Sequence, residues 1–340
     1  MKSARRNSIG KSHFQLFAVF TIFFAVAAGT VTASAQVTAV PPYTVSVFAK
    51  SMKPHYYQPD SIAVWSNTVF IGYGNNAKPD GTFGHSTIVQ YAMDGSVMQI
   101  YEVKGHNDGI KVDPQTNLVW LLQNEDANPN LVILDPKNGN MKKYTFAKPA
   151  HGGGYDDMAF GGRDVFISCS NPANNPNTKQ AIVKAKLQGH SVVVTPILLG
   201  NDFATSITTG QQVQLNLQDP DSMTFDTAGD LVLDSQADAE LIILHHPGAK
   251  DQSVFQFPLT SGGSSVQIDD TIFPAVSQGL FLVSDRDGET VYSVTAPFFG
   301  PDPFSAAPTF VGQLNLSTGV LSPVVMGTVN SHGMTFIPAQ

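Results

Sequence analysis

The chain contains one cysteine, Cys169, among 340 residues. No disulfide can form within it, so its fold cannot depend on that kind of cross-link. Cys169 ends the apolar run Val165-Phe166-Ile167-Ser168-Cys169, which predicts a buried strand. A lone cysteine in such a run usually packs as a small hydrophobe, so we do not consider it a candidate nucleophile.

Several catalytic signatures are missing as well. The sequence has no strand-to-helix serine elbow, no phosphate-binding glycine loop and no His-Glu-x-x-His metalloprotease motif. The triplet Gly152-Gly153-Gly154 is typical of a turn. The sequence therefore speaks against the hydrolases, nucleotide-binding proteins and zinc proteases that these motifs mark.

The first 35 residues have the composition of an export signal. Four basic residues (Lys2, Arg5, Arg6 and Lys11) precede an apolar run from about residue 14 to residue 28, and Ala33-Ser34-Ala35 follows. This order predicts a secretory signal peptide over residues 1–35 and a secreted or periplasmic protein. An uncleaved membrane anchor is the alternative. After cleavage we expect no stable membrane span.

Basic residues are scarce in the remaining chain. Without those four, 15 Lys and Arg stand against 27 Asp and Glu, a formal net charge of −12. A chain so acidic is a poor ligand for nucleic acid, which we exclude as a partner. A small-molecule substrate or a protein ligand remains.

Long stretches with the helical period are also missing, and short apolar runs alternate with turns rich in Gly, Pro and Asn. One motif recurs in front of these runs: an acidic residue two positions before Ile or Met. The copies start at Asp60, Asp108, Asp156, Asp221 and Asp270, and a sixth has His332 in the acidic position. Their spacings of about 48 to 65 residues are those of β-propeller blades, four-stranded sheets repeated around an axis.

We therefore predict that residues 36–340 form a single all-β domain, a propeller of six blades with five as the alternative. In the second repeat, strands are expected over 109–112, 118–122, 131–134 and 141–146. The sixth blade would combine residues 333–338 with residues 43–49, leaving two of its strands unidentified. Residues 290–293 and 310–316 are expected to be strands of one blade, and residues 296–308 between them a surface excursion.

The recurring carboxylates predict a metal site. In a propeller the innermost strand of every blade lines the axis, so residues at the start of these strands converge. Converging carboxylates repel one another unless they are protonated or bind a hard cation such as Ca²⁺. On this basis Asp60, Asp156, Asp221 and Asp270 are candidate ligands. Aspartates before strands also serve as turn caps, which is the alternative for each of them.

Histidines near the same positions are candidates for proton transfer. His106 precedes the second repeat, His151 precedes the third, and His332 occupies the sixth acidic position. Of these we select His106 and His332 as candidate catalytic residues. Histidines in turns are otherwise often no more than hydrogen-bonded surface groups.

Two motifs resemble the gluconolactonase and regucalcin family. Asn107-Asp108-Gly109-Ile110-Lys111-Val112-Asp113-Pro114 is similar to a family segment in which Asn-Asp-Gly precedes Lys-Val-Asp-Pro, and Pro220-Asp221-Ser222-Met223 is similar to its Pro-Asp-Gly strand. The resemblance implies that Asn107 is a metal ligand and that Asp221 is both a ligand and the general base. Asp156 stands where the family has an amide ligand, and Asp60 follows Gln58-Pro59 where the family has Glu-Gly-Pro.

The resemblance thus implies a Ca²⁺-dependent lactone or ester hydrolase with Asp60, Asn107, Asp156 and Asp221 around the cation. A different class of function remains open. A secreted propeller can bind a ligand or a protein partner without catalysis, because fold alone does not fix function. Convergence of the carboxylates in an open cavity would favour the enzyme.

Overall fold

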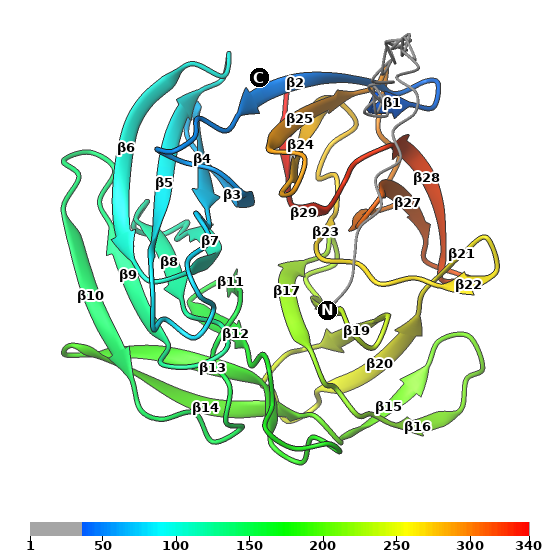
Figure 1. The fold of residues 1–340 in the computed structure, drawn as a ribbon. Coiled ribbons are helices and arrows are strands. Elements are labelled where there is room, and N and C mark those ends of the chain that lie inside the picture. Colours follow the sequence, from blue (N-terminus) through cyan, green and yellow to red (C-terminus); the bar gives the residue numbers. More distant parts are fainter. Residues whose placement is uncertain (1–35, 340) are drawn as a thin grey trace, which may run out of the picture. The chain divides into compact units, whose positions relative to one another are not determined.

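The computed structural model describes residues 36–339. The predicted signal peptide, residues 1–35, lies outside the described residues. Within them the chain forms 29 strands and no helix, and so offers no helix that could cross a membrane. The strands form five hydrogen-bonded sheets around a central axis (Figure 1). The protein is an all-β propeller, as the repeat predicts.

The first sheet follows chain order from the axis outward. Each strand pairs antiparallel with the next, which is what short connecting turns impose. Its strands are β3 (Pro59–Trp65), β4 (Thr68–Tyr73), β5 (His85–Ala92) and β6 (Val97–Lys104).

The eight-stranded sheet consists of two such four-stranded units. Their outer strands, β10 and β14, join through parallel pairs, Thr145 with Ser191 and Phe146 with Val192. The four strands predicted for the second repeat, β7 to β10, are confirmed to within two residues at their ends. The strands are β7 (Asn107–Val112), β8 (Val119–Gln123), β9 (Asn130–Leu134), β10 (Met141–Phe146), β11 (Met158–Gly161), β12 (Asp164–Ser168), β13 (Gln180–Gln188) and β14 (Ser191–Leu199).

Two further sheets carry a short hairpin on their outer edge, which covers backbone groups that an edge strand would otherwise expose. One contains β17 (Pro220–Phe225), β18 (Leu231–Ser235), β19 (Glu240–His245) and β20 (Ser253–Pro258), with the hairpin β15 (Phe203–Ser206) and β16 (Gln212–Gln214). The other contains β23 (Thr271–Ile272), β26 (Phe304–Ala307), β27 (Phe310–Asn315) and β28 (Val320–Met326), with the hairpin β21 (Thr260–Ser261) and β22 (Ser264–Ser265), and with β1 (Thr38–Ala39) on β28.

The sheet that closes the ring unites the two termini of the described chain. Its order is β2 (Thr44–Lys50), β25 (Thr290–Thr295), β24 (Gly279–Asp285) and β29 (Ser331–Pro338). The two terminal segments therefore share one sheet, as predicted, although β2 pairs with β25 and β29 pairs with β24. Strands β24 and β25 are the two that the sequence left unidentified. We interpret the whole arrangement as six blades, two of which share one sheet.

The strand plan expected after residue 290 is wrong. Residues 290–293 and 310–316 were assigned to one blade, but β25 pairs with β24 and β2, whereas β27 pairs with β26 and β28. The segment between β25 and β26 is also more than a surface excursion. Phe299 lies buried there, with its ring centroid 5.8 Å from that of Phe304 and 5.3 Å from that of Phe336.

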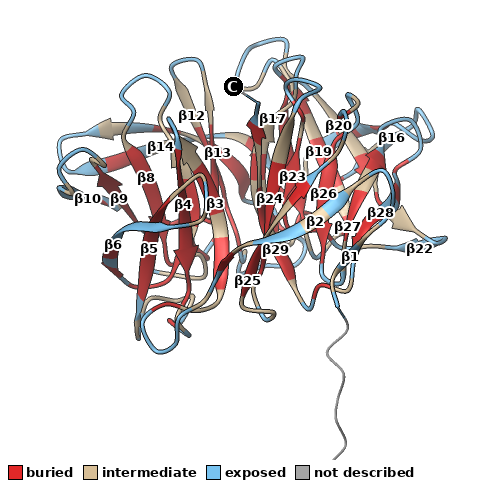
Figure 2. Cartoon of the chain, turned by 90° about the horizontal axis from the view of Figure 1, so that it is seen from above, coloured by how far each residue is buried: buried red, intermediate tan, exposed pale blue. Residues whose placement is uncertain are grey.

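The core lies between neighbouring sheets, and exposed residues gather at loops and outer edges (Figure 2). One apolar cluster, for example, joins Ile182 of β13 to Met223 and Leu233 of the following sheet. Each sheet is thus held by contact with the next, and the inner strands keep fixed positions around the axis. That arrangement positions the side chains at the start of every inner strand.

Candidate functional site

An acidic cavity of about 210 Å³ lies at the start of the inner strands. At this point the pairing register of β3, β7 and β17 with the next strand is irregular, as at a β-bulge, which redirects side chains. The repeat position contributes Asp60, Asp108, Asp156, Asp221, Asp269 and His332, and the remaining lining residues are Ser61, His106, Glu125, Asp126, Ser170, Asp219, Ser222, Gln236 and Arg286.

Most of the residues predicted from the sequence meet here. Asp60, Asp156, Asp221, His106 and His332 all line the acidic cavity. The convergence expected for a propeller axis is therefore present for these five.

Asn107 does not join them. Its side chain is fully buried, and its Nδ2 donates a hydrogen bond to the carbonyl oxygen of Leu122 (2.7 Å). A Cβ at position 72 would lie only 2.7 Å from the Oδ1 of Asn107. This close approach explains why β4 has glycine at that position. Asn107 lies between strands, and the next residue, Asp108, faces the cavity.

Asp270 also lies elsewhere, and Asp269 takes the place expected for it. The carboxylate of Asp270 accepts a hydrogen bond from the backbone N–H of Met334 (2.7 Å). Asp157 does the same for Met223 (3.0 Å). The pair Asp269-Asp270 therefore corresponds to Asp156-Asp157. The repeat position in this blade is Asp269, one residue before the Asp270 that the sequence predicts.

Spacing could have revealed this register. An aromatic residue stands four positions after Asp156, Asp221 and His332, in the form of Phe160, Phe225 and Phe336. Phe273 stands four positions after Asp269 and three after Asp270. The aromatic position thus selects Asp269 as the member of the repeat.

Three groups of side chains place possible metal-binding atoms within 4.8 Å of one another. One consists only of carboxylates, Asp108, Glu125 and Asp156. The other two share Asp60, and they are Asp60 with Asp269 and His332, and Asp60 with His106 and Asp108. Glu125, which follows β8, and Asp219, which precedes β17, lie outside the repeat, so the repeat does not predict them.

Four carboxylates of the cavity are buried and repel one another: Glu125, Asp156, Asp219 and Asp221. Burial raises the pKa of Asp156 well above its usual range, and the nearby charges of Asp108 and Asp221 raise it further. Burial and neighbouring carboxylates have the same effect on the pKa of Glu125 and Asp221. Asp219 has a pKa of about 6 for the same reasons. Protons or a bound cation would relieve this repulsion.

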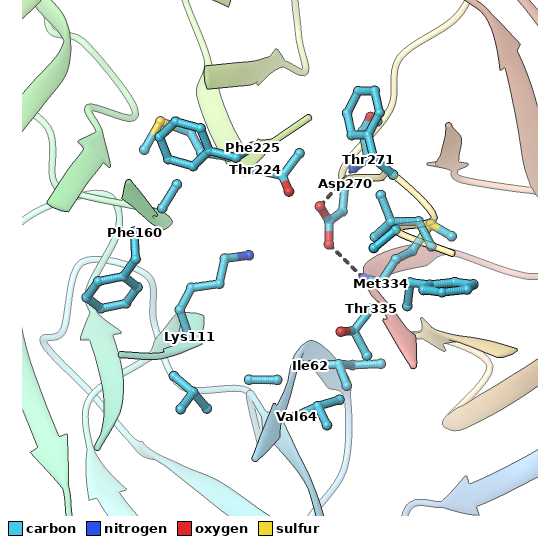
Figure 3. Close-up of a pocket in the computed structure, with 18 of the residues that line it drawn as sticks. Ile62, Val64, Lys111, Phe160, Thr224, Phe225, Asp270, Thr271, Met334 and Thr335 are labelled. Atoms are coloured by element: carbon cyan, nitrogen blue, oxygen red, sulfur yellow. Dashed lines mark hydrogen bonds between the residues drawn. The ribbon is translucent and has the colours of Figure 1, made fainter. Parts of the chain in front are cut away.

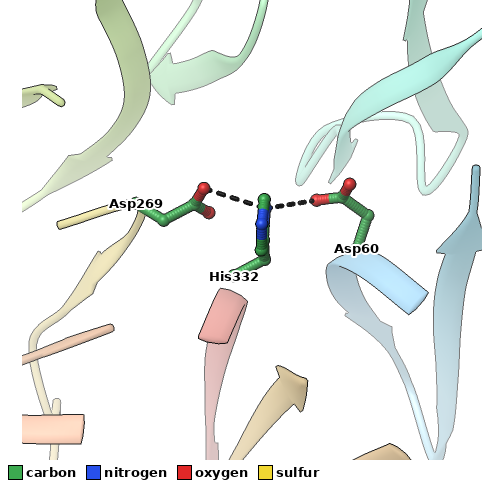
Figure 4. Close-up of side chains that lie close together, drawn as sticks. All are labelled: Asp60, Asp269 and His332. Carbon is green, nitrogen blue, oxygen red and sulfur yellow. Dashed lines mark ion pairs between the residues drawn. The ribbon is translucent and has the colours of Figure 1, made fainter. Parts of the chain in front are cut away.

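The opposite side of the cavity carries positive charge. His332 Nδ1 lies between two carboxylates, 2.9 Å from Asp269 Oδ1 and 3.5 Å from Asp60 Oδ1 (Figure 4). Burial acts to lower the pKa of His332, but Asp269 and Asp60 outweigh it and raise the pKa well above its usual value. The two carboxylates therefore favour the protonated form of the imidazole.

Asp60 is ionised by the same neighbours. Burial acts to raise its pKa, yet the charges of His332 and Arg286 hold it at about 2. Arg286 Nε lies 3.7 Å from Asp60 Oδ2. The acidic cavity thus combines a cluster of carboxylates that lack compensating charge with an ordered group of ion pairs.

His106 stands between these two regions. Its ring is buried, and Nδ1 lies 3.1 Å from the carbonyl oxygen of Ala77, so this nitrogen carries a proton and donates it. Nε2 lies 3.6 Å from Glu125 Oε1. Nε2 is therefore the ring nitrogen that faces Glu125, a residue of the cavity lining.

No protein-family model matches the chain, and a search of curated proteins found no match. Comparison with solved structures found distant likenesses. Virginiamycin B lyase from Staphylococcus aureus is 12% identical, with 87% of this chain and 100% of that chain covered and a TM-score of 0.48. A structure called a "putative gluconolactonase" is 9% identical, with coverages of 86% and 83% and a TM-score of 0.46.

A protein of unknown function from Bacteroides caccae is 10% identical, with 84% of this chain and 88% of that chain covered and a TM-score of 0.49. The distant resemblance to a gluconolactonase noted in the motifs is thus also found among the structural neighbours.

Proposed function

We propose that the protein is a divalent-cation-dependent hydrolase of a small lactone or ester. The observation that carries the proposal is the group Asp108, Glu125 and Asp156, whose carboxylate oxygens lie within 4.8 Å of one another in a cavity. Oxygen ligands of this kind suit a hard cation, and Ca²⁺ is the first candidate. The raised pKa values of Glu125 and Asp156 support it, because a cation would offset their repulsion.

The proposed cation site differs from the one that the family resemblance implies. Asp156 is common to both, Asp60 pairs with His332 and Arg286, and Asn107 is engaged between strands. Asp108 and Glu125 replace these two as ligands. When bound, the cation would polarise the carbonyl of the substrate.

The protein's own side chains can supply the proton chemistry. Asp221 lines the same cavity, and its raised pKa makes it a stronger base than an ordinary carboxylate, suited to taking a proton from water. His332 is held by two carboxylates that favour its protonated form, so it can stabilise a developing oxyanion or return a proton to the leaving oxygen. Arg286 can orient an oxygen-rich substrate.

Calorimetric titration of the purified protein with Ca²⁺ tests the first step. We expect binding that Asp156→Asn abolishes and that Asp135→Asn, a control in an exposed turn, leaves unchanged. A dissociation constant of about 10⁻⁴–10⁻³ M, the range of extracellular modules, would suit the export that we propose. No binding to the unaltered protein would refute the cation site.

Hydrolysis of a panel of lactones and aryl esters tests the second step. We expect Asp221→Asn to lower kcat by at least about 100-fold while Ca²⁺ still binds, as for loss of a general base. Cation binding without any hydrolysis would instead favour the alternative, a propeller that binds a ligand or protein partner.

A further inference from the structure

A second cavity, of about 420 Å³, is formed by later residues of the same inner strands (Figure 3). Its volume lies within the usual range of small-molecule pockets. We call it the apolar cavity, because its walls include Ile62, Val64, Phe160, Phe225, Phe273 and Phe336. None of these residues lines the acidic cavity.

Two charged residues also line the apolar cavity, one in β7 and one directly before β23. The side chain of Lys111 points into it, as does that of Asp270 (Figure 3). Lys111 Nζ lies 2.8 Å from Asp157 Oδ2, so the positive charge of Lys111 already has a carboxylate partner. Asp157 is itself buried and fixed by the backbone N–H of Met223.

Asp270 has no such partner. It is 5% exposed, and its carboxylate accepts hydrogen bonds from the backbone N–H groups of Thr271 (2.8 Å) and Met334 (2.7 Å). Between residues 36 and 339, no Lys, Arg or His nitrogen lies within 4.0 Å of its oxygens. A buried carboxylate of this kind is costly unless a cation compensates it.

We propose that the apolar cavity binds an organic ammonium ion whose charged group pairs with Asp270 and whose apolar body lies against the phenylalanine rings. Aromatic faces attract such cations by cation–π interaction, most strongly where water is excluded. This site is separate from the acidic cavity, and its function does not depend on hydrolysis there.

Other classes of ligand fit less well. An organic anion would bring its charge close to Asp270, and the one ammonium group in the lining, that of Lys111, is already paired with Asp157. An inorganic cation would lose its water against largely apolar walls. A neutral apolar molecule would fill the cavity and bury the Asp270 carboxylate further without compensating its charge.

Three probes with the same ring but different end groups test the charge requirement: 2-phenylethylammonium, 2-phenylethanol and 3-phenylpropanoate. Met223 and Met334 line the apolar cavity, so their methyl signals in ¹³C-methyl-methionine-labelled protein report where a probe binds. We expect the ammonium to shift both signals and to bind at least about 10-fold more tightly than the alcohol. Equal or tighter binding of the alcohol or the anion would overturn the proposal.

Four variants then separate the two cavities. We expect Asp270→Asn to abolish the preference for ammonium over alcohol, and Phe273→Leu to reduce it several-fold while keeping an apolar wall. Asp156→Asn, in the acidic cavity, and Asp302→Asn, which removes an exposed carboxylate, should leave the preference unchanged. Loss of the preference in Asp156→Asn but not in Asp270→Asn would place the ammonium in the acidic cavity and refute the inference.

Asp270→Asn could fail to fold, because Asp270 accepts two backbone hydrogen bonds. Near-UV circular dichroism checks this. If Asp270→Asn is unfolded, Phe273→Leu becomes the test of the proposal. An unchanged preference for ammonium over alcohol in Phe273→Leu would contradict a cation held against aromatic rings.

Discussion

The carboxylate of Asp157 accepts a hydrogen bond from the backbone N–H of Met223, 3.0 Å away in the inner strand β17. The same carboxylate lies 2.8 Å from Lys111 Nζ, on the inner strand β7. One buried side chain therefore ties three parts of the ring together around the axis. Asp270 forms the corresponding link to Met334 of β29.

We expect Asp157→Ala to lower the free energy of unfolding by about 3–5 kcal/mol. The substitution leaves the Lys111 ammonium and the backbone N–H of Met223 without this partner in the interior. Urea denaturation measures the change. Asp164→Ala is the matched control. It breaks the ion pair of Asp164 with Lys184 (2.7 Å), in which both side chains are more than 40% exposed, and should cost less than about 1 kcal/mol. Equal losses in the two variants would contradict the role given to Asp157.

Asp156→Asn should have the opposite effect on stability. The ionised Asp156 carboxylate is repelled by Asp108 and Asp221, so replacing it with a neutral amide is expected to stabilise the cation-free protein at pH 8 by about 1 kcal/mol. The same variant should lose the rise in melting temperature that Ca²⁺ gives the unaltered protein. Thermal unfolding with and without 10 mM CaCl₂ measures both. A variant that is less stable without Ca²⁺ would show that Asp156 serves the fold.

Much of the fold can be predicted from the sequence, because each regular sheet is built from consecutive strands joined by recognisable turns. The strands of the second repeat follow directly from apolar runs separated by Asp-Pro and Asn-Gly turns. The two middle strands of the closing sheet, β24 and β25, cannot be predicted in this way. After β23 the chain leaves its sheet, forms β24 and β25 in the closing sheet, and returns to β26. Non-local pairing of this kind leaves no periodic signal.

The site was predictable to the extent that it lies on the repeat. Asp60, Asp156, Asp221 and His332 share one position in successive inner strands, so symmetry alone brings them together. Glu125 and Arg286 come from loops, whose course around the axis depends on tertiary packing. Asn107 does not line the cavity for a local reason, since adjacent residues of a strand face different ways and only Asp108 faces the cavity.

Stability is expected to fall as the pH rises from 5 to 8. The pKa values of Glu125, Asp156 and Asp221 are higher in the folded protein than in the unfolded chain. The stability that such groups contribute is complete below about pH 4 and is lost as the pH rises through the folded pKa. His332 changes in the same direction above about pH 6.5, because its pKa is also raised.

Only Asp60 among these residues acts in reverse, and its contribution is lost below about pH 4 as the pH approaches its pKa of about 2. The melting temperature should therefore be several degrees higher at pH 5 than at pH 8, and CaCl₂ should reduce the difference. Scanning calorimetry across this range is the measurement. A melting temperature that rises towards pH 8 without Ca²⁺ would contradict the raised pKa values.

The contact between the closing sheet and its neighbour can be tested through Phe281. This side chain of β24 is fully buried, and its ring centroid lies 5.1 Å from that of Phe304 in β26. Because β24 lies far along the chain from β2 and β29, side chains such as Phe281 must hold the closing sheet in the ring. We expect Phe281→Ala to destabilise the protein by about 3–5 kcal/mol.

The control for this variant is Phe83→Ala, since Phe83 is 69% exposed and its loss should change stability by less than about 0.5 kcal/mol. Hydrogen exchange of Phe281→Ala gives a second readout. Amides of β2, β24 and β29 should lose protection before those of β7 to β10, because the closing sheet would open first. Uniform loss of protection around the ring would show that all the sheets unfold as one unit. The closing sheet would then be no weaker than the others, although its strands β24 and β25 lie between two strands of the neighbouring sheet in the sequence.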